Sequence, residues 1–186
     1  MFKVGGQYRM LYGDWDNIRG AVSSDGKTFT RIEGKFTEVP GANTRDPMAI
    51  LIDGTWHCYT TAHPENKGAV YSRISTDLKT WTEPKIVARG GAAGTGPYSA
   101  ECPYVVNRKG NFYLFRTQRY GKTAQTTVYR SKDPRDFGVD DDRCRIGTLD
   151  IAAPEIFQHD GQDYMASLLP SLKGIQIVRL AWEPAK

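Results

Sequence analysis

The chain has 186 residues, enough for one domain with a substantial core. Its formal net charge of +4 comes from scattered basic residues with no accompanying recognition motif, which argues against nucleic acid as a partner. No apolar run approaches the ~20 residues that a membrane span needs, and the N-terminus lacks the apolar core of a secretion signal. We therefore expect no membrane association and, for the chain as it stands, a cytoplasmic location.

The residue types that most often bind metals or cofactors are dispersed along the chain. The cysteine count is odd and no Cys-x-x-Cys pair occurs, which argues against a disulfide framework and against a zinc site. The three histidines are too far apart to suggest a metal cluster. The glycine-rich run at 90–96 precedes an expected strand rather than a helix, so it does not qualify as a phosphate loop. We predict no metal and no cofactor.

Four short aromatic-rich runs, each behind a glycine, are the first predicted elements along the chain. Aromatic residues at this density favour β-strands. No amphipathic helical stretch of useful length stands out, so the sequence predicts an all-β fold. The runs lie at 7–12, 55–59, 111–115 and 162–165, behind Gly6, Gly54, Gly110 and Gly161, which we call the marker glycines.

A further strand in each segment is expected to end in a Ser-x-Asp turn. The turn occurs at Ser23, Ser75 and Ser131, and the fourth segment lacks it. Because short polar side chains bond neighbouring backbone groups, we interpret its aspartates as structural. The marker glycines recur after 48, 56 and 51 residues, a period typical of propeller blades. We predict one β-propeller domain over 1–186, with four-stranded antiparallel blades at about 1–40, 41–92, 93–147 and 148–186.

A proline stands seven residues before each of the last three marker glycines, and each proline has a carboxylate nearby. The segments are Arg45-Asp46-Pro47, Glu101-Cys102-Pro103 and Pro154-Glu155, and we call their prolines the marker prolines. Different acidic residues at one repeat position predict side chains that converge from several blades on one site. A carbohydrate-active propeller is therefore the leading hypothesis.

The motifs at 44–47 and 100–103, one blade apart, resemble the Arg-Asp-Pro and Glu-Cys-Pro motifs of the five-bladed propeller glycosidases. These are the enzymes of glycoside hydrolase families 32 and 68 and the related family 43, which act on fructosyl, arabinosyl and xylosyl glycans. The resemblance implies that Asp46 stabilises an oxocarbenium-like transition state and that Glu101 is the general acid that protonates the leaving oxygen. It also implies that Arg45 and Cys102 shape the pocket.

The same resemblance places a further aspartate, a nucleophile or base, on the inner strand of the first blade. Counted back from Gly6, that aspartate would stand before Met1, and the segment 2–4 resembles the tail of its strand. We expect an incomplete propeller of the five-bladed type with four blades visible. The chain would then be part of an active enzyme, a remnant that binds sugar without cleaving it, or a site in which another carboxylate substitutes.

The loops between the second and third strands of the predicted blades return to the face that carries the site, because antiparallel strands alternate in direction. Side chains in these loops are candidates to reach a bound sugar. They are Asp14 or Asp16 as a replacement carboxylate, Trp15 as a stacking ring, and His63 and Arg119 as sugar contacts, with Glu155 on its inner strand as a further one.

Four hypotheses of function stay open. The chain is a hydrolase of oligo- or polysaccharides, a carbohydrate-binding propeller without catalysis, a mannoside phosphorylase-like enzyme in which Arg116 and Arg119 bind phosphate, or a protein-interaction scaffold. An incomplete ring exposes strand edges, and unpaired edges invite pairing with another chain. We therefore expect either a homodimer through the blade edges or poor solubility.

Overall fold

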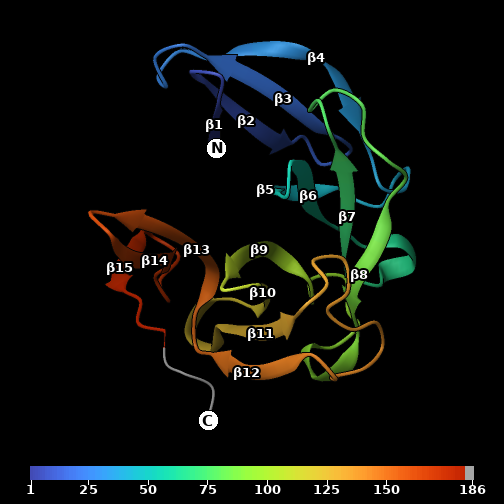
Figure 1. Cartoon of the computed structure of the whole chain (residues 1–186). Coiled ribbons are helices and arrows are strands. Elements are labelled where there is room, and N and C mark those ends of the chain that lie inside the picture. Colours follow the sequence, from blue (N-terminus) through green and yellow to red (C-terminus); the bar gives the residue numbers. More distant parts are fainter. Residues whose placement is uncertain (183–186) are drawn as a thin grey trace.

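The computed structural model describes residues 1–182 and consists of four antiparallel sheets arranged as the blades of a β-propeller (Figure 1). In each blade the strands pair in chain order. Three blades have four strands, and blade 4 has three among the described residues. Helical structure in this part of the chain is limited to three short 3-10 segments, Pro64–Asn66, Gly91–Ala93 and Gly121–Thr123. The prediction of an all-β propeller with four blades is confirmed.

The strands of the four blades have the following bounds. Blade 1 contains β1 (Phe2–Val4), β2 (Gln7–Gly13), β3 (Ile18–Ser23) and β4 (Thr30–Phe36), and blade 2 contains β5 (Arg45–Ile52), β6 (Thr55–Ala62), β7 (Ala69–Ser75) and β8 (Lys85–Arg89). Blade 3 contains β9 (Glu101–Arg108), β10 (Asn111–Arg119), β11 (Gln125–Ser131) and β12 (Arg145–Leu149), and blade 4 contains β13 (Ala152–His159), β14 (Gln162–Leu168) and β15 (Ile175–Arg179). The four aromatic-rich runs predicted as strands lie within β2, β6, β10 and β14.

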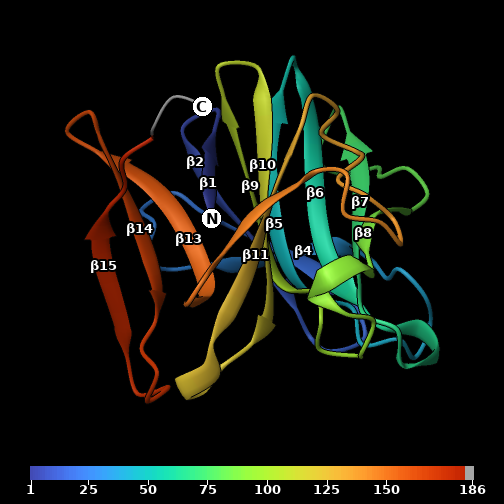
Figure 2. The ribbon, with the colours of Figure 1, turned by 90° about the horizontal axis from the view of Figure 1, so that it is seen from below.

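The inner strands β5, β9 and β13 surround the axis, and each is eight residues long, whereas the inner strand β1 has three. Seen from below, β5, β9 and β13 stand side by side (Figure 2). Neighbouring blades contact one another through β2 and β5, β5 and β9, and β9 and β13. Within residues 1–182 no strand of blade 1 packs extensively on blade 4, and Figure 1 shows an open ring that ends at these two blades.

Hydrophobic clusters join successive blades face to face. Between blades 2 and 3 the cluster includes Tyr59, Val70, Leu114, Tyr129 and Phe137, all with at most 1% exposure. Between blades 3 and 4 it includes Phe115, Val128, Ile156 and Met165. Burial of one large apolar side chain stabilises the fold by about 1.5–3 kcal/mol, so these contacts fix how the inner strands meet at the axis.

The Ser-x-Asp turns are structural, as the sequence predicted. Asp25 Oδ1 accepts hydrogen bonds from the backbone N–H groups of Lys27 and Thr28 at 2.8 and 2.9 Å, and Asp77 Oδ1 accepts two equivalent bonds at 2.8 Å. These bonds favour the ionised carboxylate and lower the pKa of Asp25 to about 2. In the part of the chain that the structure describes, no helix has the length and apolar character needed to cross a bilayer.

Candidate active site at the propeller axis

The inner strands β5, β9 and β13 begin with the same backbone corner. The residue before each marker proline has a positive φ, 54° at Asp46, 44° at Cys102 and 50° at Ala153. The strand register shifts beside each of these residues. Irregularities of this kind re-aim side chains and are common beside active sites. The corner therefore determines where the first side chains of each inner strand point.

The three acidic residues occupy different positions of the repeat, which corrects the expectation of one shared position. When the corners are matched, Asp46 corresponds to Cys102 and Ala153, and Glu101 corresponds to Arg45. Glu155 comes one residue after its marker proline. The marker prolines thus identify the backbone corner and not a shared carboxylate position. Glu101 stands before its corner residue, Asp46 is a corner residue, and Glu155 follows its corner residue.

An axial cavity of about 340 Å³ lies between the starts of the three inner strands. Its wall includes Asp46, Cys102, Ala153 and Glu155. Glu101 is not on this wall, and its side chain, 15% exposed, turns toward Arg45. The expectation that the Asp46 and Glu101 carboxylates face one cavity is therefore met by Asp46 alone, while Glu155 supplies a second carboxylate to the same wall.

Arg45 links the two predicted catalytic carboxylates. Its Nε donates to Glu101 Oε1 at 3.0 Å, its Nη2 forms an ion pair with the same oxygen, and Nε lies 3.8 Å from Asp46 Oδ2. The Nη1 group donates to the carbonyl oxygen of Asn43 at 2.8 Å. The guanidinium is almost fully buried, with a side-chain exposure of 8%. Because both carboxylates lie next to the Arg45 guanidinium, Asp46 and Glu101 are neighbours across the junction of blades 2 and 3.

Cys102 and Tyr120 complete this cluster on the blade 3 side. The backbone N–H of Cys102 donates to Asp46 Oδ2 at 3.1 Å, which fixes that carboxylate from the neighbouring strand. The Cys102 thiol lies 3.3 Å from the Tyr120 hydroxyl. Burial, and after it the nearby negative charge of Asp46, raises the pKa of Cys102 to about 12, so the thiol is neutral. Burial likewise raises the pKa of Tyr120.

Tyr120 was missed by the sequence analysis, which named its neighbour Arg119 in the same loop. The Arg119 side chain is exposed and donates to Gln125 Oε1 at 2.6 Å, away from the axial cavity. Which of the two neighbours, Arg119 or Tyr120, points toward the site depends on the strand register at the end of β10, and this register shifts between Thr117 and Arg119. The spacing of residues in the sequence does not reveal such a shift.

The other predicted loop residues do not line the axial cavity. The Asp14 carboxylate is occupied, because it is paired with Arg19 and accepts the backbone N–H of Asn17 at 2.7 Å. These bonds lower the pKa of Asp14 to about 2, with the Arg19 bond as the largest cause. Trp15 is 68% exposed, and the His63 ring packs edge-on against Tyr98 at 6.1 Å.

The start of the loop after β2 nevertheless lies close to the site. A Cβ atom placed on Gly13 would lie 3.1 Å from the Cα atom of Arg45. Asp14, Trp15 and Asp16 therefore follow directly on a residue that packs against β5. Asp14 is held in place there as a structural residue rather than presented as a free carboxylate.

Arg116 is fully buried, which excludes it as a ligand for a phosphate from solution. Its guanidinium donates to the carbonyl oxygens of Ser99 at 2.7 Å, Gly90 at 3.1 Å and Gly94 at 2.8 Å. Burial lowers its pKa, since no carboxylate bonds directly to it. Of the two arginines in the phosphate hypothesis, Arg116 is therefore bound to backbone carbonyl groups inside the protein, and Arg119 alone is exposed. Among residues 1–182, no group of three or more acidic, histidine or cysteine side chains is placed to hold a metal ion.

The chain resembles solved glycosidase structures without matching a known family by sequence. No model of a protein family and no curated protein matches it. It is similar to an endo-arabinase from Bacteroides thetaiotaomicron, with a TM-score of 0.75 and 15% identity over 99% of this chain and 74% of that chain. It is also similar to an endo-1,4-beta-xylanase from the same organism, with a TM-score of 0.72 and 14% identity over 95% and 67% of the two chains.

A third similar structure is the family 32 beta-fructofuranosidase of Bombyx mori. Its TM-score is 0.66 and its identity is 22% over 89% of this chain. The chain spans 41% of the length of that enzyme. At these identities the similarity shows a shared fold, the propeller of family 32 and related glycoside hydrolases.

Proposed function

We propose that the chain is a carbohydrate-active propeller of the glycoside hydrolase type, acting on fructosyl-, arabinosyl- or xylosyl-containing glycans where the axial cavity, lined by Asp46 and Glu155, borders the junction of blades 2 and 3 that holds Glu101. The observation that carries this proposal is the cluster of Asp46 and Glu101 around one buried arginine, at the junction of two inner strands. Glycoside hydrolysis normally employs a pair of carboxyl groups on either side of the scissile bond. The fold that the chain shares with glycosidases supports the same chemistry.

In this proposal Glu101 gives a proton to the leaving oxygen, and Asp46 accepts hydrogen bonds from sugar hydroxyls as charge develops on the ring. The backbone N–H of Cys102 and the guanidinium of Arg45 hold Asp46 in position for that role. Glu155, which lines the cavity and has no ion-pair partner among the described residues, is the candidate for the opposing carboxylate. Arg45 and Cys102 are positioning residues here.

The test is a hydrolysis screen on sucrose, an arabinan, a xylan and their 4-nitrophenyl glycosides. Glu101→Gln should lower kcat on the natural glycans by about 10²–10⁴-fold. It should lower kcat less on nitrophenyl glycosides, because their leaving group needs little protonation. The matched control is Glu83→Gln, which alters an exposed glutamate outside the site and should leave the rates unchanged.

Glu155→Gln tests whether Glu155 is the carboxylate that acts opposite Glu101. A loss of hydrolysis on both substrate types is expected if Glu155 acts as the opposing group. Unchanged rates in Glu155→Gln would remove it from the mechanism, and unchanged rates in Glu101→Gln would overturn the general-acid assignment.

A carbohydrate-binding propeller without catalysis is the second candidate. It is favoured by the ion pair between Arg45 and Glu101, because a carboxylate held by a guanidinium acts naturally as an acceptor for sugar hydroxyls. Saturable binding of one of these glycans with no turnover, weakened by Asp46→Asn, would support it. Absence of both binding and turnover would contradict both candidates.

A further inference from the structure

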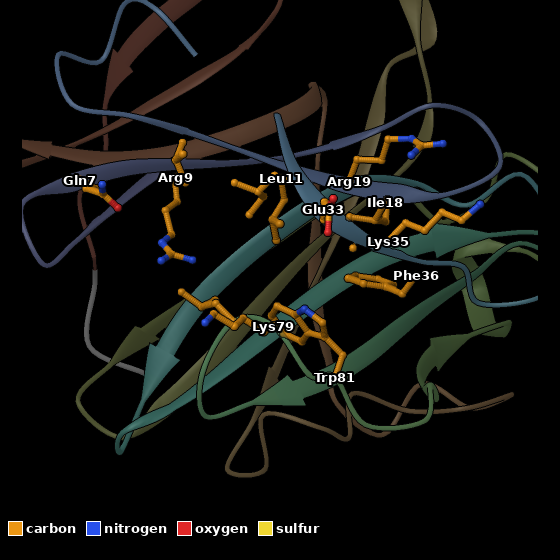
Figure 3. Close-up of a pocket in the computed structure, with 15 residues that line it drawn as sticks. Gln7, Arg9, Leu11, Ile18, Arg19, Glu33, Lys35, Phe36, Lys79 and Trp81 are labelled. Carbon is orange, nitrogen blue, oxygen red and sulfur yellow. The ribbon is translucent and has the colours of Figure 1, made fainter. Parts of the chain in front are cut away.

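A second cavity lies away from the axial site, between blades 1 and 2. Its volume is about 620 Å³, and none of the residues that line it lines the axial cavity. Its walls come from β2, β3 and β4 on one side and from the turn after β7 on the other (Figure 3). This volume falls in the range of about 300–1,000 Å³ that small-ligand sites occupy. We call it the interblade cleft.

Aromatic and aliphatic side chains form the inner surface of the interblade cleft. The rings of Phe36 and Trp81 lie 5.5 Å apart with an interplanar angle of 49°, and Leu11 and Ile18 also line the cleft (Figure 3). Trp81 is half-buried, so part of its ring remains accessible within the cleft. Ring faces of this kind accept the apolar face of a sugar, with the polar edges of the ligand left free.

Positive charge dominates the remaining lining. Arg9, Arg19, Lys35 and Lys79 line the cleft, against Glu33 as its carboxylate. Arg19 is neutralised by Asp14, whereas within residues 1–182 Arg9, Lys35 and Lys79 form no ion pair. The unpaired cations Arg9, Lys35 and Lys79 outnumber the carboxylate of Glu33 in the lining, and their like charges repel one another. A bound anion removes that repulsion.

Arg9 is the residue that points most directly to an anion. It extends from β2 into the space that Lys79 borders from the opposite wall (Figure 3). Its Nε is buried and has no hydrogen-bond partner in the structure. A buried donor without a hydrogen-bond partner is unfavourable. A guanidinium is also the side chain best matched to a carboxylate or a sulfate, which it can bind with two parallel hydrogen bonds.

We infer that the interblade cleft is a second binding site, for an acidic sugar unit of a glycan. The Trp81 ring, packed on Phe36, holds the sugar face, and Arg9 and Lys79 hold its carboxylate or sulfate. This inference concerns binding and is independent of hydrolysis at the axis. Its failure is therefore separable from the failure of the proposed function.

The test is 19F NMR of the protein labelled with 5-fluorotryptophan, in which each of the four tryptophans gives its own resonance. The Trp81 signal is assigned with Trp81→Phe. The probes are trigalacturonate as a carboxylated sugar, a sulfated disaccharide, and xylotriose as the neutral control. At least one acidic probe should shift the Trp81 resonance saturably, and which of them does so identifies the anionic group.

Lys79→Ala should weaken the binding of the acidic probe at least about tenfold, since hydrogen bonds to charged groups are among the stronger ones. Lys79 is exposed in a turn, so its removal leaves the fold intact. Arg9→Gln should weaken binding further, and Lys27→Ala, an exposed lysine outside the cleft, should not change it. No Trp81 shift with either acidic probe, an equal shift with xylotriose, or unchanged affinity in Lys79→Ala would overturn the inference.

Discussion

Arg45 in blade 2 and Glu101 in blade 3, 56 residues apart in the chain, are joined by a hydrogen bond of 3.0 Å from Nε to Oε1. Both side chains are mostly buried, at 8% and 15% exposure. The ion pair ties the starts of two inner strands together at the place where the proposed catalytic carboxylates meet. It therefore contributes to the site and to the junction of the blades at the same time.

Removal of the arginine should destabilise the protein. Arg45→Met leaves Glu101 as a largely buried carboxylate without its cation, and a broken buried pair costs roughly 3–5 kcal/mol. We expect a fall of about 3 kcal/mol in the free energy of unfolding, measured by urea titration. The comparison is Arg19→Met, which breaks a partly exposed pair with Asp14 and should lower the free energy of unfolding much less, because solvent screens an exposed ion pair. Equal losses in the two variants would contradict the structural role of Arg45.

Arg116 should hold the loop between β8 and β9 in place. Arg116→Met removes the donors that three loop carbonyl groups share, those of Gly90, Gly94 and Ser99. We expect faster amide hydrogen exchange across 90–99 and a loss of at least about 2 kcal/mol in unfolding free energy, because buried acceptors lose their partner. Arg119→Met, which alters an exposed side chain on the same strand, should change neither measurement.

Cys102 should make the protein less stable at alkaline pH. Its pKa is raised from 9.0 to about 12 in the folded state, so the neutral thiol is favoured by folding. The corresponding stability is fully present below pH 9 and is lost as the pH rises from about 9 toward 12. Cys102→Ser lacks this titration. Between pH 8 and pH 10.5, the midpoint of urea unfolding should therefore fall less for this variant than for the wild type. Parallel falls in both proteins would contradict this assignment.

The outer strand of blade 4 should promote self-association. Ile175, Ile177 and Val178 on β15 are 63%, 56% and 48% exposed, and β15 is a sheet edge in the described structure. Exposed apolar edges are sites of pairing with other chains. Ile177→Lys should shift the protein toward the monomer in sedimentation experiments at equal concentration. The matched change Thr30→Lys, at an exposed residue of β4, should leave the distribution as in the wild type.

Most of the fold could be predicted from the sequence because the blade signals are local. An aromatic run behind a glycine and a Ser-x-Asp turn depend on neighbouring residues, and both recur where the structure has them. The opening between blades 1 and 4 was expected from the resemblance to five-bladed propellers, of which the sequence shows four blades. The cleft between blades 1 and 2 was not, since the packing density between two sheets depends on side chains that are far apart in the sequence.

The site was predictable at the level of its motifs and not of its geometry. The segments around Asp46 and Glu101 were identified, and the structure places them at one junction. Their different positions relative to the corner could not be read from spacing, because a shift of one residue in a strand reverses the direction of its side chain. For the same reason Tyr120 was missed, and Arg119 was named although it points away.

The positive φ at Ala153 shows that the backbone corner is a feature of the propeller fold and does not depend on a functional side chain. A non-glycine residue in this conformation costs of order 1–3 kcal/mol. The strained residue Asp46 also places a carboxylate on the wall of the axial cavity. Ala153 bears the same strain and offers only a methyl group. The strain thus recurs at the start of each of the three eight-residue inner strands, whatever side chain stands there. The three inner strands therefore present equivalent backbone positions around the axis, and each position carries a different side chain, Asp46, Cys102 or Ala153.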